Sequence, residues 1–224
     1  FMKKMVLLTL CLLSGIFILT GCSSDAAPFT KKDYTVDGKQ VTGICIDVRD
    51  RKIEVSLSAD DQIHMEYFEN NKEYYDISVS DDKVLAMNAK NNKDWTDYIG
   101  GKISADFRII SLQIPETLLS VLNLSTTNGD ISLPPITVAD EVVLSSNSGN
   151  IIFDKLAAGR TISVSNKNGD ISGSIAGSYE DFNISCDIKK GRSNLPDRKN
   201  SGEKTLDILN NNGDIGIKFI GNRN

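Results

Sequence analysis

The chain has 224 residues, of which 40% are hydrophobic and 25% are charged, and its formal net charge is −5. The apolar share is too high for a disordered chain and is sufficient for a core in one or two domains. One histidine and four cysteines leave few ligands for a zinc site, and the acidic balance argues against a nucleic-acid-binding surface, which needs clustered lysine and arginine. We therefore expect no metal, no cofactor and no nucleic-acid partner.

Residues 1–21 have the organisation of a secretory signal peptide. Lys3 and Lys4 precede an apolar run over residues 5–19. This run is shorter than the about 20 apolar residues that a transmembrane helix needs, and it fits the hydrophobic region of a signal peptide. We therefore expect the protein to act outside the cytoplasm.

The segment Leu19-Thr20-Gly21-Cys22 places two small residues directly before a cysteine. It resembles the lipobox of bacterial lipoproteins, and this resemblance implies cleavage before Cys22 and attachment of a diacylglycerol to its thiol. Two or more acyl chains on one residue give stable anchoring. We therefore expect Cys22 to bind membrane lipid at the extracytoplasmic face of the bacterial cell membrane, with residues 22–33 as a polar tether.

Residues 34–105 predict an irregular β region. Apolar and polar residues alternate over residues 44–48, 53–57 and 63–67, which is typical of half-buried strands. Further along, residues 80–83 separate two short apolar stretches and predict a hairpin turn. We expect these strands to form the first coils of the fold or a cap over its open edge.

Trp95 and Tyr98 lie in a stretch of polar residues and glycines that predicts a loop. Their rings can stack on sugars or on a partner protein, which makes them the candidate binding residues. In the alternative, which we favour, the loop plugs one end of the fold and Trp95 is buried.

Residues 106–224 contain a repeat centred on glycine, and the glycines are separated by 20, 20, 22 and 22 residues. Apolar residues recur seven and five positions before most of these glycines, and two and four positions after them. Two stretches of period-two alternation around a glycine predict a strand, a tight turn and a second strand. The five turns contain Gly129 and Asp130, Gly149 and Asn150, Gly169 and Asp170, Gly191 and Arg192, and Gly213 and Asp214.

Such a repeat predicts an all-β solenoid in which successive coils stack about 4.8 Å apart. The residue after glycine then forms a ladder along the stack. In chain order, every second rung of this ladder is neutral or cationic (Asn150 and Arg192), which a structural ladder needs because stacked carboxylates repel. Calcium-binding β-rolls have nine-residue repeats and an uninterrupted acidic row, so we expect no metal site here.

Cys45 and Cys186 are the cysteines that remain in the predicted folded part. The expected compartment permits a disulfide between them, and two unpaired thiols are the alternative. Cys186 stands five positions before Gly191, so stacking in chain order predicts that it faces the core between Val164 and Ile208.

The segment from Ile110 to Pro115, the alternation of Leu122 with Leu124, and Asn128-Gly129-Asp130-Ile131 are similar to the bacterial putative-adhesin family. The resemblance covers about residues 40–219. It implies a single-stranded right-handed β-helix, here with 20–22 residues per coil. The family has no established activity, so it implies no catalytic residue.

We therefore predict a cell-surface lipoprotein that binds or scaffolds without catalysis. Ladders of serine, threonine and asparagine suit repetitive partners such as a cell-wall glycan or another surface protein. One alternative is an envelope sensor that regulates a membrane protein. Another is a polysaccharide lyase or hydrolase, with Asp170, Arg192 and Asp214 as candidate catalytic residues. His64 is the only histidine, and we expect it to face solvent.

Overall fold

The computed structural model describes residues 27–98, 103–116 and 119–221, so the predicted signal peptide and Cys22 lie outside the described residues. The described residues form an all-β fold of seventeen strands, and none of their helices is long and apolar enough to cross a membrane. The elements are β1 (Thr30–Asp37), η1 (Gly38–Gln40), β2 (Gly43–Val48), β3 (Lys52–Leu57), β4 (Gln62–Glu69), β5 (Glu73–Val79), β6 (Val84–Asn91), η2 (Trp95–Tyr98), η3 (Ala105–Phe107), β7 (Ile109–Ile114), β8 (Leu119–Thr126), β9 (Ile131–Leu133), β10 (Ile136–Ser146), β11 (Ile151–Ala158), β12 (Thr161–Asn166), β13 (Ile171–Ala176), η4 (Tyr179–Asp181), β14 (Phe182–Lys190), β15 (Arg198–Lys199), β16 (Lys204–Asn212) and β17 (Ile215–Ile220).

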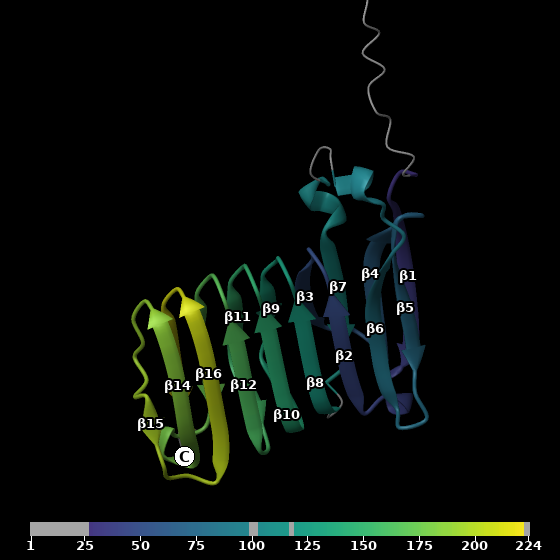
Figure 1. The fold of residues 1–224 in the computed structure, drawn as a ribbon. Coiled ribbons are helices and arrows are strands. Elements are labelled where there is room, and N and C mark those ends of the chain that lie inside the picture. Colours follow the sequence, from purple (N-terminus) through teal and green to yellow (C-terminus); the bar gives the residue numbers. More distant parts are fainter. Residues whose placement is uncertain (1–26, 99–102, 117–118, 222–224) are drawn as a thin grey trace, which may run out of the picture.

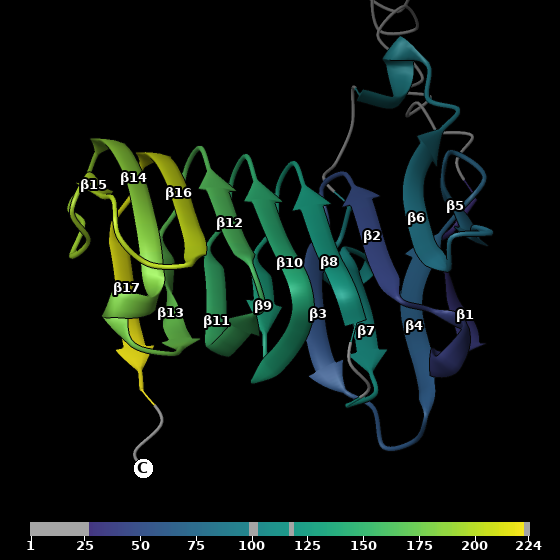
Figure 2. The ribbon, with the colours of Figure 1, turned by 90° about the horizontal axis from the view of Figure 1, so that it is seen from below.

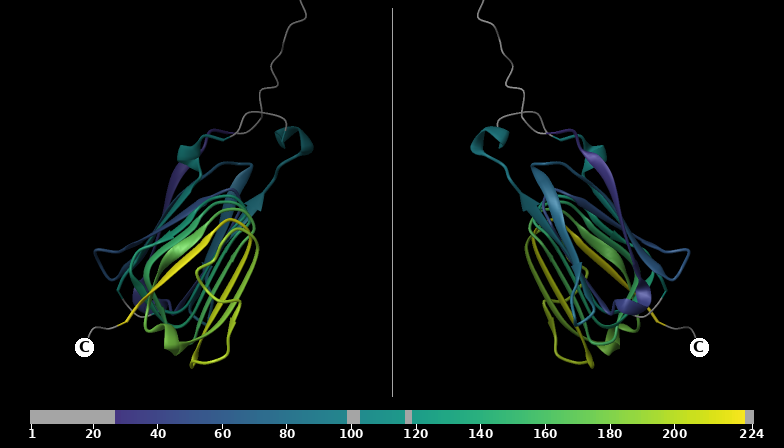
Figure 3. Two further views of the ribbon diagram at one scale, coloured as in Figure 1. Left: turned by 90° about the vertical axis from the view of Figure 1, so that its left-hand side faces the viewer. Right: turned by 90° about the vertical axis from the view of Figure 1, so that its right-hand side faces the viewer.

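The strands lie in two facing rows of one curled sheet (Figures 1 and 2). The first row has the order β5-β6-β2-β8-β10-β12-β16-β14. The second row has the order β1-β4-β7-β3-β9-β11-β13-β17. From β6 and β7 onward all pairs within a row are parallel, whereas β1, β4 and β5 pair antiparallel and form a cap. Viewed along the rows, successive coils lie behind one another (Figure 3).

Apolar side chains stack between the two rows because parallel pairing keeps equivalent positions in register. Leu122, Val142, Ile162 and Leu206 are aligned across four strands of the first row, and each is fully buried. The isoleucines two positions after the turn glycines are aligned in the same way in the second row. Full burial of one such side chain stabilises the fold by about 1.5–3 kcal/mol.

The turns between the rows need glycine for two reasons, which Gly169 illustrates. Its φ of +133° is a conformation that side chains disfavour. A Cβ atom at this position would also overlap the carbonyl oxygen of Gly149 in the neighbouring coil. The repeated glycine therefore marks where one coil rests directly on the next.

Three positions before the turn glycine, a polar side chain points inward and is buried. We call Thr126, Ser146, Asn166 and Asn210 the inner polar rung. Asn166 Nδ2 donates a hydrogen bond to the carbonyl oxygen of Gly149 at 2.8 Å, and Asn210 Nδ2 donates to that of Gly169 at 3.0 Å. Each amide thus satisfies a backbone acceptor in the adjacent coil, and the apolar pattern alone did not reveal this role.

The order of the last two coils differs from the prediction. Val164 pairs with Ile208, and Ile208 pairs with Cys186, so β16 lies between β12 and β14. The prediction that Cys186 lies between Val164 and Ile208 was therefore wrong, although its side chain is buried as expected. After β14 the chain passes through β15 and returns inward, which places β16 inside the first row, while β17 ends the second row.

This order also corrects the predicted charge alternation. Asp170 and Asp214 are neighbours on the ladder, and Arg192 lies beyond Asp214. Two adjacent acids are tolerated because the backbone N–H of Asp214 donates to Asp170 Oδ1 at 2.8 Å, and that of Arg192 donates to Asp214 Oδ1 at 2.8 Å. The ladder is held by bonds from backbone to side chain.

The N-terminal region is also interleaved. The coil formed by β2 and β3 lies between β6–β7 on one side and β8–β9 on the other. The hairpin expected at residues 80–83 joins β5 to β6, and the Lys83 N–H donates to the Ser80 carbonyl at 2.9 Å. The N-terminal region therefore contributes the parallel strands β2, β3 and β6 and the antiparallel strands β1, β4 and β5.

The two cysteines are free. Cys45 lies on β2 and Cys186 on β14, and β8, β10, β12 and β16 separate these strands. At about 4.8 Å per strand the separation is about 24 Å, far beyond the reach of a disulfide. The disulfide alternative is therefore excluded by the fold.

Replacement of either amide of the inner polar rung should destabilise the fold. Asn166→Ala and Asn210→Ala each leave a half-buried glycine carbonyl without its donor, which costs about 1–2 kcal/mol. The free energy of unfolding in urea measures this effect. Asn183→Ala, at an exposed position of β14, is the control and should change it by less than about 0.5 kcal/mol. Equal losses in all three variants would contradict the assigned role.

Candidate ligand-binding site

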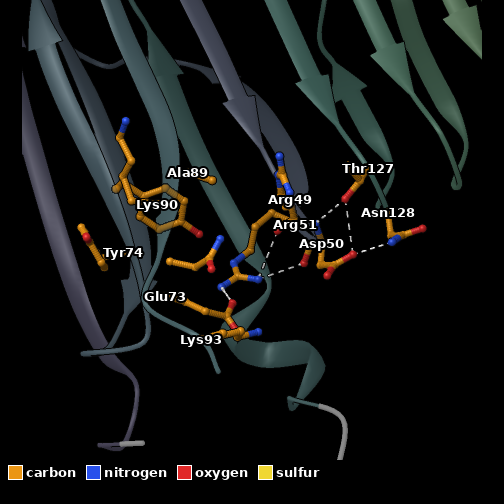
Figure 4. A pocket seen from close by; sticks show the side chains of 12 residues that line it. Arg49, Asp50, Arg51, Glu73, Tyr74, Ala89, Lys90, Lys93, Thr127 and Asn128 are labelled. Carbon is orange, nitrogen blue, oxygen red and sulfur yellow. Dashed lines mark hydrogen bonds and ion pairs between the residues drawn. The ribbon is translucent and has the colours of Figure 1, made fainter. Parts of the chain in front are cut away.

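The candidate site lies where the regular turns of the stack are interrupted. Arg51 takes the place of the turn glycine in the coil formed by β2 and β3, because its carbonyl oxygen accepts a hydrogen bond from Thr126 of the inner polar rung at 2.8 Å. In the next coil outward, the turn is expanded into the residues between β6 and β7, which carry η2 and η3. A cavity of about 260 Å³ opens here (Figure 4). It is lined by Arg49, Asp50, Arg51, Glu73, Tyr74, Tyr75, Ala89, Lys90, Asn91, Lys93, Thr127 and Asn128.

A buried ion pair forms the base of the cavity. The Arg51 side chain is 1% exposed, and its Nη2 donates to Glu73 Oε2 at 2.7 Å. Its guanidinium also lies 5.8 Å from the ring of Phe29 and 6.0 Å from the ring of Tyr75. Lys93 forms a second ion pair with Glu73. The carboxylate of Glu73 therefore holds two cations in fixed positions.

The pKa of Glu73 reflects these contacts. Burial of the carboxyl raises its pKa, but the hydrogen bonds from Lys93 and Arg51 outweigh burial, and the pKa ends below its ordinary value. The carboxylate is thus charged at neutral pH. Since the pKa is lower in the folded chain than in the unfolded one, acid removes the stabilisation that this group contributes.

Two further cations stand at the mouth of the cavity. Arg49 directly follows β2 and Lys90 lies on β6, and both residues line the cavity. Both side chains are exposed, and neither forms an ion pair with an acid among the described residues. Figure 4 shows them extending away from the pair of Arg51 and Glu73. Two cations at one cavity without a compensating acid create a local positive potential.

The aromatic residues predicted for binding belong to the expanded turn. Trp95 is 74% exposed, so the expectation that it is buried as a plug was wrong. It lies in η2, two residues after Lys93 of the cavity lining. Tyr98 ends η2, but its side chain lies outside what the structure describes. An exposed indole beside a cavity remains available to a ligand.

The acids proposed for polysaccharide cleavage lie at the other end of the stack. Asp170, Asp214 and Arg192 are adjacent, and a shallow depression is found beside them. Arg192 Nη2 donates to Asp214 Oδ2 at 3.1 Å, while Oδ1 of each acid already accepts a backbone N–H. The backbone N–H of Arg192, and then its guanidinium, lower the pKa of Asp214. The three residues therefore join neighbouring turns of the ladder through hydrogen bonds.

His64 faces outward, as predicted, and is held by local bonds. Its ring hydrogen-bonds to Asp60 Oδ1 at 2.9 Å and to Thr35 Oγ1 at 3.2 Å. The bond from His64, together with those from the Gln62 backbone and the Ser58 hydroxyl, lowers the pKa of Asp60 to about 2. Within residues 27–98, 103–116 and 119–221, no group of three or more His, Cys, Asp or Glu is placed to hold a metal ion.

Sequence reasoning missed Arg49, Arg51, Glu73 and Lys90. A signal for Arg51 was present, because Ile44, Ile46, Ile53 and Val55 stand seven and five positions before it and two and four positions after it. This is the spacing of the glycine repeat with arginine at its centre. Lys90 had no such signal, since its place in the cavity lining follows only from the pairing of β6 with β2.

The fold and site together define a curled all-β solenoid with an antiparallel cap and a cavity at the capped end. The chain belongs to the Toastrack DUF4097 family, whose model matches residues 41–221. A crystal structure of a "putative cell adhesion protein" from Clostridium sporogenes is similar, with a TM-score of 0.62 and 14% identity over 86% of this chain and 100% of that chain. A "putative adhesin" from Bacteroides fragilis matches with a TM-score of 0.37 and 15% identity over 86% and 97% of the two chains. No curated protein gives a significant match. At this identity the Clostridium structure supports the fold alone.

Glu73→Gln should destabilise the chain at neutral pH by about 3 kcal/mol, because it leaves the buried charge of Arg51 uncompensated. The loss relative to the unsubstituted chain should shrink as the pH falls from the ordinary Glu pKa of 4.5 through the lower pKa of the folded chain, where the native carboxylate also becomes protonated. Unfolding curves in urea between pH 7 and pH 3 measure both effects. Glu54→Gln, which breaks the exposed pair with Lys52, is the control and should cost less than about 1 kcal/mol. A loss that is independent of pH would contradict this account.

Proposed function

We propose that this chain is a lipid-anchored protein of the bacterial cell surface that binds or scaffolds without catalysis. The observation that carries the proposal is an exposed Trp95 beside a cationic cavity at one end of the solenoid. Exposed aromatic side chains next to a concave polar site are typical of binding surfaces. The description of the Clostridium sporogenes neighbour as a cell adhesion protein agrees with such a role.

The first described residue, Ala27, lies at the capped end of the molecule. Cys22 is five residues before Ala27, whose N–H donates to Asn71 Oδ1 at 2.9 Å and whose carbonyl accepts from Asn70 Nδ2 at 3.0 Å. Residues 70 and 71 precede β5, which begins with Glu73 of the cavity. Signal-peptide cleavage and lipidation at Cys22 would therefore hold the capped end towards the membrane.

The remainder of the solenoid supplies a flat polar surface. Ser125, Ser145 and Ser165 are aligned on neighbouring strands, and Ser165 Oγ donates to Ser145 Oγ at 3.0 Å. We propose a right-handed winding with about 20–22 residues per coil. Hydrogen bonds between turns 20 and 22 residues apart support this coil length. Such a surface suits repetitive partners, a cell-wall glycan or another surface protein.

Cys22→Ser tests the proposed anchoring. The full-length chain should incorporate an alkyne-labelled fatty acid and sediment with the membrane fraction, whereas the variant should do neither. Cys45→Ser, at a thiol within the fold, is the matched control and should behave like the unsubstituted chain. Equal labelling of the Cys22→Ser variant would refute the anchor.

Trp95→Ala tests the proposed binding. Cells that display the full-length chain should retain purified cell-wall glycan, and the variant should retain about fivefold less, because stacking of a sugar on an aromatic ring contributes about 1 kcal/mol. The melting temperature should stay unchanged, since the indole is exposed. Release of new reducing ends from the glycan would show catalysis and contradict the proposal.

A further inference from the structure

We propose that the cavity at the capped end binds the anionic group of an acidic saccharide, a sugar that carries a carboxylate or a phosphate. This inference rests on the proposed binding function and adds the class of ligand. The site consists of Arg49 and Lys90 at the mouth, Arg51 at the base and Tyr74 at the side.

The charge of the cavity selects an anion. Four cations and two acids line it, although the whole chain has a formal net charge of −5. Both acids are engaged: Glu73 pairs with Arg51 and Lys93, and Asp50 accepts hydrogen bonds from the side chains of Thr127 and Asn128. Arg49 and Lys90 are therefore left to a ligand.

A buried donor at the base gives independent support. Arg51 Nε is buried and has no hydrogen-bond partner within the described part of the chain. More than nine in ten buried polar groups in proteins are paired. The guanidinium cannot turn to find a partner, because Glu73 holds Nη2 and the rings of Phe29 and Tyr75 lie against it. The buried guanidinium therefore adds a positive charge that is fixed in position at the base of the cavity.

The neutral lining suits a sugar better than a bare ion. Tyr74 pairs with Lys90 across the strands, which places an aromatic side chain beside the cations. Asn91, Thr127 and Asn128 add amide and hydroxyl groups for sugar hydroxyls. The volume of about 260 Å³ is below the range of about 300–1,000 Å³ for sites that enclose drug-sized ligands. The cavity therefore suits one charged sugar residue of a longer glycan.

Calorimetric titration of the full-length chain tests this proposal with four probes: trigalacturonate, its neutral methyl ester, glucose 6-phosphate and inorganic phosphate. At least one of the two sugar anions should bind about tenfold more tightly than the methyl ester and than inorganic phosphate. The tighter of the two identifies carboxylate or phosphate as the preferred group. Equal affinity for the ester or for inorganic phosphate would overturn the proposal.

The double variant Arg49→Gln, Lys90→Gln should bind the preferred sugar anion at least about tenfold more weakly, because it removes two charge-assisted contacts. Lys167→Gln, Lys189→Gln changes the net charge equally at exposed lysines outside the cavity and should bind like the unsubstituted chain. Equal loss in both variants would reduce the effect to net charge and overturn the site.

Two outcomes separate this inference from the proposed binding function. If the displayed chain still retains glycan while the sugar anions fail to bind, the ligand class alone is wrong. If both fail, the binding function is wrong as well.

Discussion

The hydrogen bonds that join each glycine turn to the turn of the next coil determine the register of the solenoid. On the outer side, Asp130 Oδ1 accepts the N–H of Asn150 at 2.7 Å, and Asn150 Oδ1 accepts that of Asp170 at 2.9 Å. On the inner side, the amides of Asn166 and Asn210 reach the glycine carbonyls of neighbouring coils. Aspartate and asparagine are interchangeable on the outer ladder because both offer an acceptor oxygen. The backbone polar groups at each turn are thereby satisfied, and the aliphatic side chains are aligned for burial.

The interleaved order of the coils places β16 inside the stack and leaves β14 as the last strand of the first row, where β15 pairs with part of it. An exposed strand edge can pair with another chain, and terminal segments fray easily. In this fold β16 is paired on both sides, by β12 and β14. The edge of β17 is covered by a side chain: Asn194 Nδ2 donates to the Ile217 carbonyl at 2.6 Å, and the Ile217 N–H donates to Asn194 Oδ1 at 2.9 Å. At the other end, β1, β4 and β5 reverse direction and close the stack.

The sequence was sufficient to predict the strands, the glycine turns and the stacked aliphatic core, because these follow from local alternation. It was insufficient for the order of the coils, since every rung offers the same apolar pattern to its neighbours. The pattern alone allows Val164 to stack on Cys186, as chain order would have it, as well as on Ile208. The candidate site was only half predictable for the same reason. Trp95 was visible as an aromatic residue in a polar loop, whereas Lys90 and Arg49, 41 residues apart in the sequence, come to line one cavity only through the pairing of β6 with β2. The site arises where the repeat is broken: Arg51 replaces glycine, and Asp50 adopts the positive φ of 54° in its place.

Cysteine cross-linking tests the coil order, on which the description of the ladder, the inner polar rung and both ends depends. In a chain with Cys45→Ala and Cys186→Ala, the pair Ser165→Cys and Leu209→Cys occupies paired positions on β12 and β16. The pair Ser165→Cys and Asp187→Cys lies two strands apart, at about 9.6 Å, because Leu209 separates the two positions. A disulfide needs Cα atoms within about 7 Å, so mild oxidation should link only the first pair, as measured by mass spectrometry of the joined peptides. A disulfide in the second pair but not in the first would show that the coils stack in chain order and would contradict the account.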